Sequence, residues 1–219
     1  VAAVRPTGHV LQITNGKGTS IDQAAASAVG EAAELWAAEH VPAERLCFSK
    51  GTGLDAPVLD DDGLARAWIK GTQLSVRRPA WVAAERVFCP PRNGPWLGPS
   101  TSSWSSNGFG AHVDRRLAVE HAVLEVWERH ALATSLPNGW TVAALRALVV
   151  DWSSELSEAV RARGFVVVPA IVARRPLPVA AVLLFDLDEP GVPLTAGYAC
   201  RRTEDAALTA ALLEAAQSR

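Results

Sequence analysis

The stretch SSNGFGAHVDRRLAVEHAVLEVWERHAL, residues 105–132, decides how the whole chain is interpreted. Its apolar residues recur at helical intervals. Asp114 precedes this pattern and is a residue type suited to cap a helix N-terminus. We therefore expect a helix that begins after Asp114 and runs to about Thr134.

Charged residues lie inside this apolar helix. His121, Glu125 and Glu128 are spaced four and then three residues apart, so they form one stripe, and Arg129 follows Glu125 by four residues. The apolar neighbours should leave little of the helix facing solvent; they are Val119, Ala122, Val123, Leu124, Val126 and Trp127. A carboxylate in such a place needs a partner, because an unpaired buried charge is costly.

An earlier helix repeats the polar pattern. Ser20 and Gln23 have the capping-box spacing, and alanine-rich helical periodicity continues to about residue 39. Ser27, Glu31 and Glu34 lie four and three residues apart on this helix, as their counterparts do on the later one. The sequence therefore predicts two helices with equivalent polar stripes.

Two interpretations of the stripes stay open. Glu125 and Arg129 could be an ordinary surface pair, worth a few tenths of a kcal/mol. Alternatively, Glu31, Glu34, Glu125 and Glu128 could together hold Mg²⁺, which takes oxygen ligands and keeps waters and substrate phosphates as well. The spacing alone does not decide between them.

The remaining elements predict an α+β fold with mixed β-sheets and packed helices. Strands are expected at residues 1–5, 10–14, 82–89, 165–172, 179–185 and 194–200. Further helices are expected at residues 64–70, 141–148 and 155–163 and from residue 203 onward, with loop at 46–63 and a turn at 136–140. Strands and helices do not alternate strictly, which argues against a doubly wound α/β sheet. Trp96 and Trp104 indicate that the Pro-, Gly- and Ser-rich segment 89–108 is an ordered loop.

Composition excludes several classes of protein. The chain has 219 residues, 49% of them hydrophobic, and a net charge of −2, so it lacks the basic field that binds nucleic acid or an anionic membrane. No apolar run approaches the roughly 20 residues of a membrane span. The three cysteines are widely spaced, without a metal or disulfide pattern, which predicts reduced thiols and a cytoplasmic location.

Two glycine-rich motifs resemble nucleotide-binding loops without matching them. A P-loop would need glycine at Leu11 and Ser or Thr at Gly18, and a dinucleotide fingerprint would need glycine at Val113. The turn NGKGTS still places Lys17 and backbone amides beside a helix N-terminus, which suits a phosphate. An exposed lysine in an ordinary turn is the alternative. No nucleophile elbow or Cys-His signature appears.

Three blocks of sequence together resemble the YcaO superfamily. They are NGKGTSIDQAAASAVGEAAELW, then SSNGFGAHVDRRLAVEHAVLEVWERHAL, then AALLEAAQSR at the end of the chain. Their order and spacing match along almost the whole chain. The resemblance implies a single YcaO-like domain over residues 1–219, with N- and C-terminal segments absent.

The resemblance also implies an activity and its cofactors. Members of this family use ATP and Mg²⁺ to phosphorylate a backbone amide of a ribosomally synthesised precursor peptide. The product is an azoline, a thioamide or an amidine. The sequence does not choose between them. The opening VRPTG and the helical stretch EAAELWAAE look closer to members that work alone or with a TfuA-like partner, which makes thioamide formation a serious rival to azoline formation.

Site residues follow from the resemblance residue by residue. It assigns the metal to Glu31, Glu34, Glu125 and Glu128, and ATP to Lys17, Ser27, His121 and Arg129. Glu214, Gln217 and Arg219 match the start of the third block. It assigns no catalytic side chain.

The sequence departs from the family pattern at two positions. Val113 and Leu117 stand where many members have Asn and Glu, so a nucleotide contact there is missing or supplied differently. This motivates an alternative hypothesis, a non-catalytic scaffold that binds a leader peptide or a partner protein. An unrelated α+β domain is a third alternative. The expected partners are a precursor peptide and a TfuA-like or leader-binding protein, with a homodimer left open.

Overall fold

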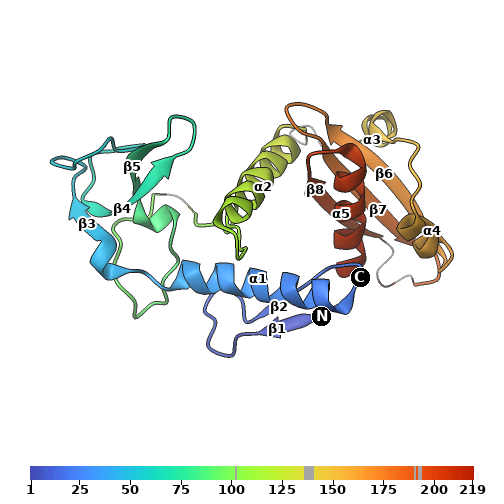
Figure 1. The fold of residues 1–219 in the computed structure, drawn as a ribbon, viewed down its shortest axis with the longest axis horizontal. Coiled ribbons are helices and arrows are strands. Elements are labelled where there is room, and N and C mark those ends of the chain that lie inside the picture. Colours follow the sequence, from blue (N-terminus) through green and yellow to red (C-terminus); the bar gives the residue numbers. More distant parts are fainter. Residues whose placement is uncertain (102, 136–140, 190, 192–193) are drawn as a thin grey trace. The chain divides into compact units, whose positions relative to one another are not determined.

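The computed structural model describes residues 1–101, 103–135, 141–189, 191 and 194–219. Its elements mix helices and strands along the chain (Figure 1). The strands are β1 (Ala2–Val4), β2 (Ile13–Asn15), β3 (Leu46–Ser49), β4 (Arg66–Gln73), β5 (Arg78–Ala83), β6 (Phe165–Ala173), β7 (Val179–Asp186) and β8 (Leu194–Cys200). The helices are α1 (Ile21–Glu39), α2 (Arg115–Ser135), α3 (Val142–Leu148), α4 (Glu155–Arg161) and α5 (Glu204–Gln217), with 3₁₀ turns at Ala43–Arg45 and Ala84–Arg86. The predicted α+β class is confirmed.

The chain divides into two compact units. The first unit comprises Val1–Ala3, Asn15–Glu31 and Asn107–Arg219, and the second comprises Val4–Thr14 and Ala32–Ser106. Helix α1 therefore contributes its first part to one unit and its last part to the other. The single domain expected over residues 1–219 stays a prediction.

The first unit is built on the antiparallel sheet β6-β7-β8. Side chains alternate between its faces, as the strand period requires. Ala180, Val182 and Leu184 of the central strand pack with the buried face of α5, whereas Val179 and Cys200 pack with Leu124 and other residues of α2. The two helices therefore pack on opposite faces of the sheet.

Several helix starts form as their sequences predict. The Asp114 carboxylate accepts from the backbone N–H of Arg116 at 2.7 Å, and Thr203 caps α5. Ser20 accepts from the Gln23 N–H at 3.2 Å. In the predicted capping box the Gln23 side chain would accept from the Ser20 N–H. It accepts from the N–H of Thr19 instead, one residue earlier in the chain. These caps satisfy backbone donors that a helix leaves unpaired.

The second unit contains the antiparallel sheet β3-β4-β5, and three predictions fail there. The helix expected at 64–70 is wrong, because residues from Arg66 onward form β4. The strand expected at 82–89 is also wrong: β5 ends at Ala83 and a 3₁₀ turn follows. The loop expected at 46–63 begins with β3. Four consecutive buried residues open β4, so its sequence lacks the alternation that marks a half-buried strand.

The segment rich in Pro, Gly and Ser is ordered by specific contacts within the second unit. The Trp104 indole donates to the Val87 carbonyl at 3.2 Å, and the Leu97 carbonyl accepts from the Ala67 N–H at 2.8 Å. Leu97 is buried, while the Trp96 ring lies near Phe48 and stays exposed. The prediction of an ordered loop is therefore confirmed where the structure describes it. The turn predicted at 136–140 lies outside the described residues.

Candidate active site

The first component of the site is the glycine-flanked Lys17, which lies against α1. A Cβ atom added at Gly16 would lie 1.8 Å from the Ala24 carbonyl oxygen, so only glycine lets the turn approach the helix this closely. Lys17 follows this contact and its ammonium lies 2.5 Å from the Glu214 carboxylate of α5. The turn thus joins α1 to α5 through an ion pair.

Helix α2 supplies two carboxylates with different surroundings. Glu125 accepts from the backbone N–H of Gly108 at 3.2 Å and is partly buried. Glu128 is only 6% exposed and accepts from the backbone N–H of Cys200 at 3.1 Å. Both are held by backbone donors of other segments, so they point into the first unit and not to bulk solvent.

Four glutamates from three helices act on one another electrostatically. Desolvation raises the pKa of the Glu31, Glu125 and Glu128 carboxyls above the ordinary value. The Glu214 carboxylate raises all three further, and Glu125 raises the pKa of both Glu31 and Glu128. We call these four residues the carboxylate cluster. Like charges within such range require a cation to coexist at neutral pH.

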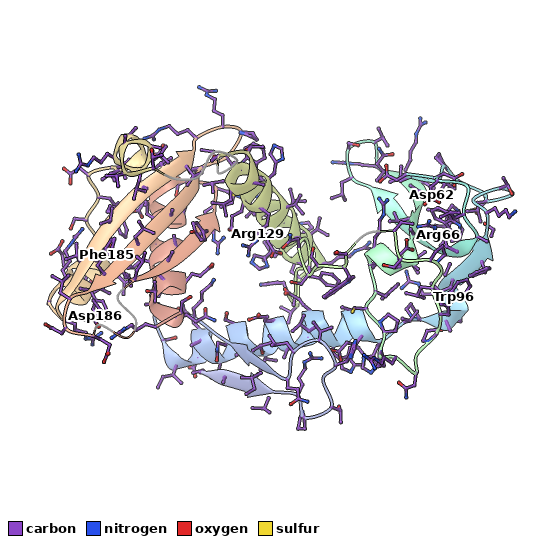
Figure 2. All side chains as sticks on the ribbon, turned by 180° about the vertical axis from the view of Figure 1, so that it is seen from behind. Asp62, Arg66, Trp96, Arg129, Phe185 and Asp186 are labelled. Carbon is purple, nitrogen blue, oxygen red and sulfur yellow. The ribbon has the colours of Figure 1, made fainter. Side chains whose placement is uncertain are left out.

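The protein's own cations only partly meet this requirement. Arg129, labelled in Figure 2, lies 3.8 Å from Glu125 and 3.7 Å from Glu128, beyond hydrogen-bond distance, and its side chain is 45% exposed. Lys17 lowers the pKa of Glu31 and Glu125 without reversing the effect of burial. The cluster therefore has spare negative charge beside the exposed Arg129 and the ion-paired Lys17.

His121 lies beside these cations. Burial lowers the pKa of its imidazole, and the nearby charges of Arg201, Lys17 and His112 lower it further. The ring is therefore neutral near pH 7, and it can both donate and accept a hydrogen bond. A neutral histidine among cations suits a contact with a ligand's polar group.

The structure brings together most of the residues that the sequence indicated. Glu31, Glu125, Glu128, Lys17, His121 and Arg129 all belong to the first unit and are coupled through the charges described above. Ser27 lies half-buried on the same part of α1. Glu34 falls within the second unit, so its expected place among the metal ligands stays a prediction.

The surroundings of α2 differ from expectation. Three of the apolar neighbours, Val119, Val123 and Val126, are exposed, because the helix buries a narrower face centred on Leu124, Glu128 and Ala131. Val113 and Leu117, where the sequence departs from the family pattern, are exposed as well. Burial of Glu128 thus comes from its packing on β8 and not from apolar residues all round.

The carboxylate cluster suits Mg²⁺ bound with phosphate better than a bare ion. Among the described residues, no group of three or more His, Cys, Asp or Glu side chains is arranged to hold a metal ion by itself. Mg²⁺ usually uses one or two carboxylates and completes its shell with waters and substrate phosphates. Spread carboxylates with raised pKa values, beside Lys17 and Arg129, fit that mode of binding.

Two residues of this region were not singled out as ligands from the sequence. Glu214 sits in the alanine-rich AALLEAAQ, where nothing in its spacing suggests a ligand, and only the third block of the resemblance pointed to it. Tyr198 of β8 lies in range of Glu214 and Arg129, and burial raises the pKa of its hydroxyl. Gln217 and Arg219 of the same block instead bind the Asn15 carbonyl and the Asp186 carboxylate.

Other expectations concern cysteines and membranes. All three cysteines are unpaired with one another, as predicted, and burial raises the pKa of the Cys200 thiol to about 11. In the described part of the chain, no helix is both long and apolar enough to cross a bilayer.

Comparison with known proteins gives consistent results. A family model described as YcaO cyclodehydratase, ATP- and Mg²⁺-binding, matches residues 15–219. An uncharacterised Mycobacterium tuberculosis protein, Rv1375, is 29% identical over 149 residues, which are 62% of this chain and 34% of that protein. The chain thus spans about a third of the length of this curated relative.

Solved structures show the same architecture. A YcaO protein from Methanopyrus kandleri, bound with AMPPCP and Mg²⁺, has a TM-score of 0.71 at 27% identity, covering 94% of this chain and 54% of that one. A heterocyclase in complex with substrate and cofactor has a TM-score of 0.75 at 16% identity, covering 92% and 32%. The E. coli microcin synthetase McbBCD complex with pro-MccB17 bound gives 0.66 at 12%, covering 99% and 63%. By the family match over residues 15–219, this chain belongs to the YcaO family, whose cofactors are ATP and Mg²⁺.

Proposed function

We propose that this chain carries the nucleotide site of an enzyme that activates a backbone amide of a ribosomally synthesised precursor peptide, giving an azoline or a thioamide. The observation that carries the proposal is the carboxylate cluster. Desolvation raises the pKa of Glu31, Glu125 and Glu128, and the cations Lys17 and Arg129 only partly offset this rise. Such an arrangement needs added positive charge, which Mg²⁺ bound with ATP would bring.

The residues have separate tasks in this proposal. Glu31, Glu125, Glu128 and Glu214 would hold the magnesium, with Glu34 as a further predicted ligand. Bound ATP would supply the phosphoryl group that turns the amide oxygen into a leaving group, and Mg²⁺ would neutralise the charge of the phosphates. Catalysis then depends mainly on positioning and electrostatics, as in phosphoryl transfer generally.

The cationic and neutral polar groups would bind the nucleotide. Lys17 follows a turn whose backbone lies against α1, and Arg129 is exposed beside the cluster, so both can reach phosphate oxygens. Neutral His121 can hydrogen-bond without adding charge, and Ser27 lies on the same stripe of α1 as Glu31.

Calorimetric titration with Mg²⁺ and ATP tests the site without knowledge of the peptide. We expect saturable binding that requires both components and is abolished in Glu128→Ala. The matched control is Glu155→Ala, which removes an exposed glutamate of α4 in the same unit. Binding that persists in Glu128→Ala would contradict the assignment of the cluster to the metal.

Mass spectrometry of a precursor peptide tests the reaction. Incubation with ATP and Mg²⁺ should lower the peptide mass by one water for each azoline formed. With sulfide present, exchange of oxygen for sulfur should raise the mass instead. Neither change, in a protein shown to be folded and to bind ATP, would contradict the proposed activity. A leader-binding or TfuA-like partner, a homodimer and a cytoplasmic setting belong to the same proposal, and the reaction should be repeated with such a partner added.

A scaffold without catalysis is the second candidate. Val113, just before α2, is fully exposed, and Leu117, in the first turn of α2, is 42% exposed. A nucleotide-binding member would be expected to present polar side chains at these two positions. Exposed apolar residues at this place favour contact with a peptide or a protein. Absence of ATP binding, together with measurable affinity for a leader peptide, would support the scaffold over the enzyme.

A further inference from the structure

At three glycines the backbone packs directly against the backbone of the three helices that carry the carboxylate cluster. A Cβ at Gly16 would lie 1.8 Å from the Ala24 oxygen and 2.4 Å from the Ala28 nitrogen of α1. At Gly110 the corresponding distances are 2.3 Å to the Ala118 oxygen and 3.0 Å to the Ala122 nitrogen of α2. Each glycine therefore faces a carbonyl and the amide four residues later.

The third contact has the same form on α5. A Cβ at Gly197 of β8 would lie 2.1 Å from the Ala211 oxygen and 2.3 Å from the Ala215 nitrogen. It would also lie 2.8 Å from the Cβ of Glu214, the cluster residue on this helix. Contacts below 3.0 Å are essentially never made by real Cβ atoms, so backbone would have to move.

The register of these contacts is shared by α1 and α2. In both, the first alanine lies eight residues after the glycine, the second alanine four residues later, and the cluster glutamate three residues after that, at Glu31 and at Glu125. A helical residue covers the turn preceding it, so each glutamate projects over the turn that its glycine contacts. The glycine contact thus sets the position of the helix one turn before its ligand.

We propose that Gly16, Gly110 and Gly197 are positioning residues, which seat α1, α2 and α5 at the depth where their glutamates serve one shared metal and nucleotide site. This inference rests on the proposed function of the cluster. Bringing backbone against backbone, without an intervening side chain, fixes helix position more tightly than packing of flexible side chains would.

Gly30 provides a matched contrast on the same helix as Glu31. A Cβ there would meet only the Ala111 Cβ at 3.8 Å, an ordinary van der Waals contact. Alanine in a helix interior is favoured over glycine by up to about 1 kcal/mol. Gly30→Ala should therefore keep or increase stability and leave the site unchanged, although it lies next to a cluster residue.

Gly197→Ala is the main test. Its added Cβ should push α5 from β8 by about 1 Å, and misplacement of that size can cost about 100-fold in turnover. We expect Mn²⁺–ATP affinity to weaken by about 10- to 100-fold, as when residues supporting metal ligands are lost. Circular dichroism should show a folded protein, and Gly30→Ala should bind as the wild type does.

A ligand-free measurement separates this inference from the proposed function. Spin labels introduced through unnatural amino acids at Val123 of α2 and Ala216 of α5, both exposed, report the spacing of these helices in the first unit. The distance should lengthen in Gly197→Ala and stay unchanged in Gly30→Ala. If wild-type protein binds no Mn²⁺–ATP, the proposed function fails. The distance between the labels still tests, by itself, whether Gly197 sets the position of α5.

Two results would overturn the inference. One is a folded Gly197→Ala protein with wild-type label distance and wild-type Mn²⁺–ATP affinity. If that variant does not fold, Gly110→Ala takes its place, because Gly110 lies in a loop that can yield without loss of a strand. The second result that would overturn the inference is failure of both variants to fold, because the glycines would then be required for folding and not for positioning.

Discussion

Glu39 at the end of α1 and Glu128 within α2 are both buried carboxylates, yet they have opposite chemistry. Glu39 of the second unit is 8% exposed and Glu128 of the first is 6% exposed. Glu39 accepts two hydrogen bonds from Arg5, both at 3.1 Å, and two more from the backbone N–H groups of His9 and Val10. Glu128 has a hydrogen bond from the Cys200 N–H and an arginine beyond hydrogen-bond distance.

The pKa values of the two carboxyls follow from these partners. Burial alone would raise the pKa of Glu39, but Arg5 and the two backbone donors together lower it below the ordinary value. Burial, together with the Glu214 and Glu125 carboxylates, raises the pKa of Glu128 by more than Arg129 and the Cys200 N–H lower it. A buried carboxylate with a full set of donors stabilises a fold, whereas one without them is available to a ligand.

The largest effect is expected from Glu39→Ala. The substitution leaves the Arg5 guanidinium partly buried, with the Leu11 carbonyl as its remaining acceptor. Breaking such a pair should cost about 3 kcal/mol in the free energy of unfolding. Urea denaturation measures this, with Glu155→Ala of α4 as the control, which should change stability by less than about 0.5 kcal/mol. A loss no larger than that of the control would show that Glu39 does not stabilise the fold more than an exposed glutamate does.

Glu128→Gln should have the reverse profile. Glutamine keeps an oxygen for the Cys200 N–H and removes a charge that the ligand-free fold disfavours, so stability at neutral pH should stay equal or rise. Mg²⁺–ATP affinity should fall by about 10- to 100-fold. Chemical denaturation and calorimetry check the two parts, with Glu155→Gln as the control. A marked loss of stability would show that Glu128 is a structural residue like Glu39.

The pH dependence of stability should separate the two carboxylates. The pKa of Glu39 is lowered on folding, so its contribution is present above the ordinary glutamate pKa of about 4.3 and is lost as pH falls through the folded value. The pKa of Glu128 is raised on folding, so stability declines as pH rises from that ordinary value through the folded one.

Unfolding curves from about pH 3 to pH 8 test this in wild type and two variants. Glu39→Gln should flatten the acidic limb, and Glu128→Gln should flatten the decline toward neutral pH. Saturating Mg²⁺–ATP should restore stability on the neutral side only where Glu128 is present. Identical pH profiles for both variants would mean that the two carboxylates do not differ in the way their contacts indicate.

The first unit was more predictable from sequence than the second. Strands β6 to β8, helices α2 and α5 and the first part of α1 are long, apolar and periodic, and caps such as Asp114 and Thr203 mark helix starts. Strand β4 begins with a fully buried arginine, Arg66, which pairs with Asp62 (both labelled in Figure 2) and with Glu85 of the same unit. Such pairing across the chain is invisible to local periodicity, so helix propensity misled the prediction there.

The site shows the same limit. Equal spacing on two helices suggested that Glu31, Glu34, Glu125 and Glu128 could act together, because spacing determines which residues share a helix face. It could not show that Glu214 joins them, since that depends on the Gly197 contact that seats α5 and on the Lys17 ion pair. Nor could it separate the buried Glu128 from the more exposed Glu31, because burial is set by packing on β8.

The smallest effect on stability is expected from Arg129→Ala, the counterpart of removing Arg5. Arg129 makes no hydrogen bond with either carboxylate at 3.7 and 3.8 Å, and its side chain is 45% exposed, so the unfolding free energy should change by less than about 1 kcal/mol. Affinity for ATP should nevertheless fall if the guanidinium binds phosphate, whereas Arg129→Lys should retain part of it. Arg163→Ala, which removes an arginine beyond the end of α4, is the control for both measurements. A large loss of stability with unchanged ATP affinity would make Arg129 a structural partner of Glu128, and the cluster would then resemble the saturated Glu39.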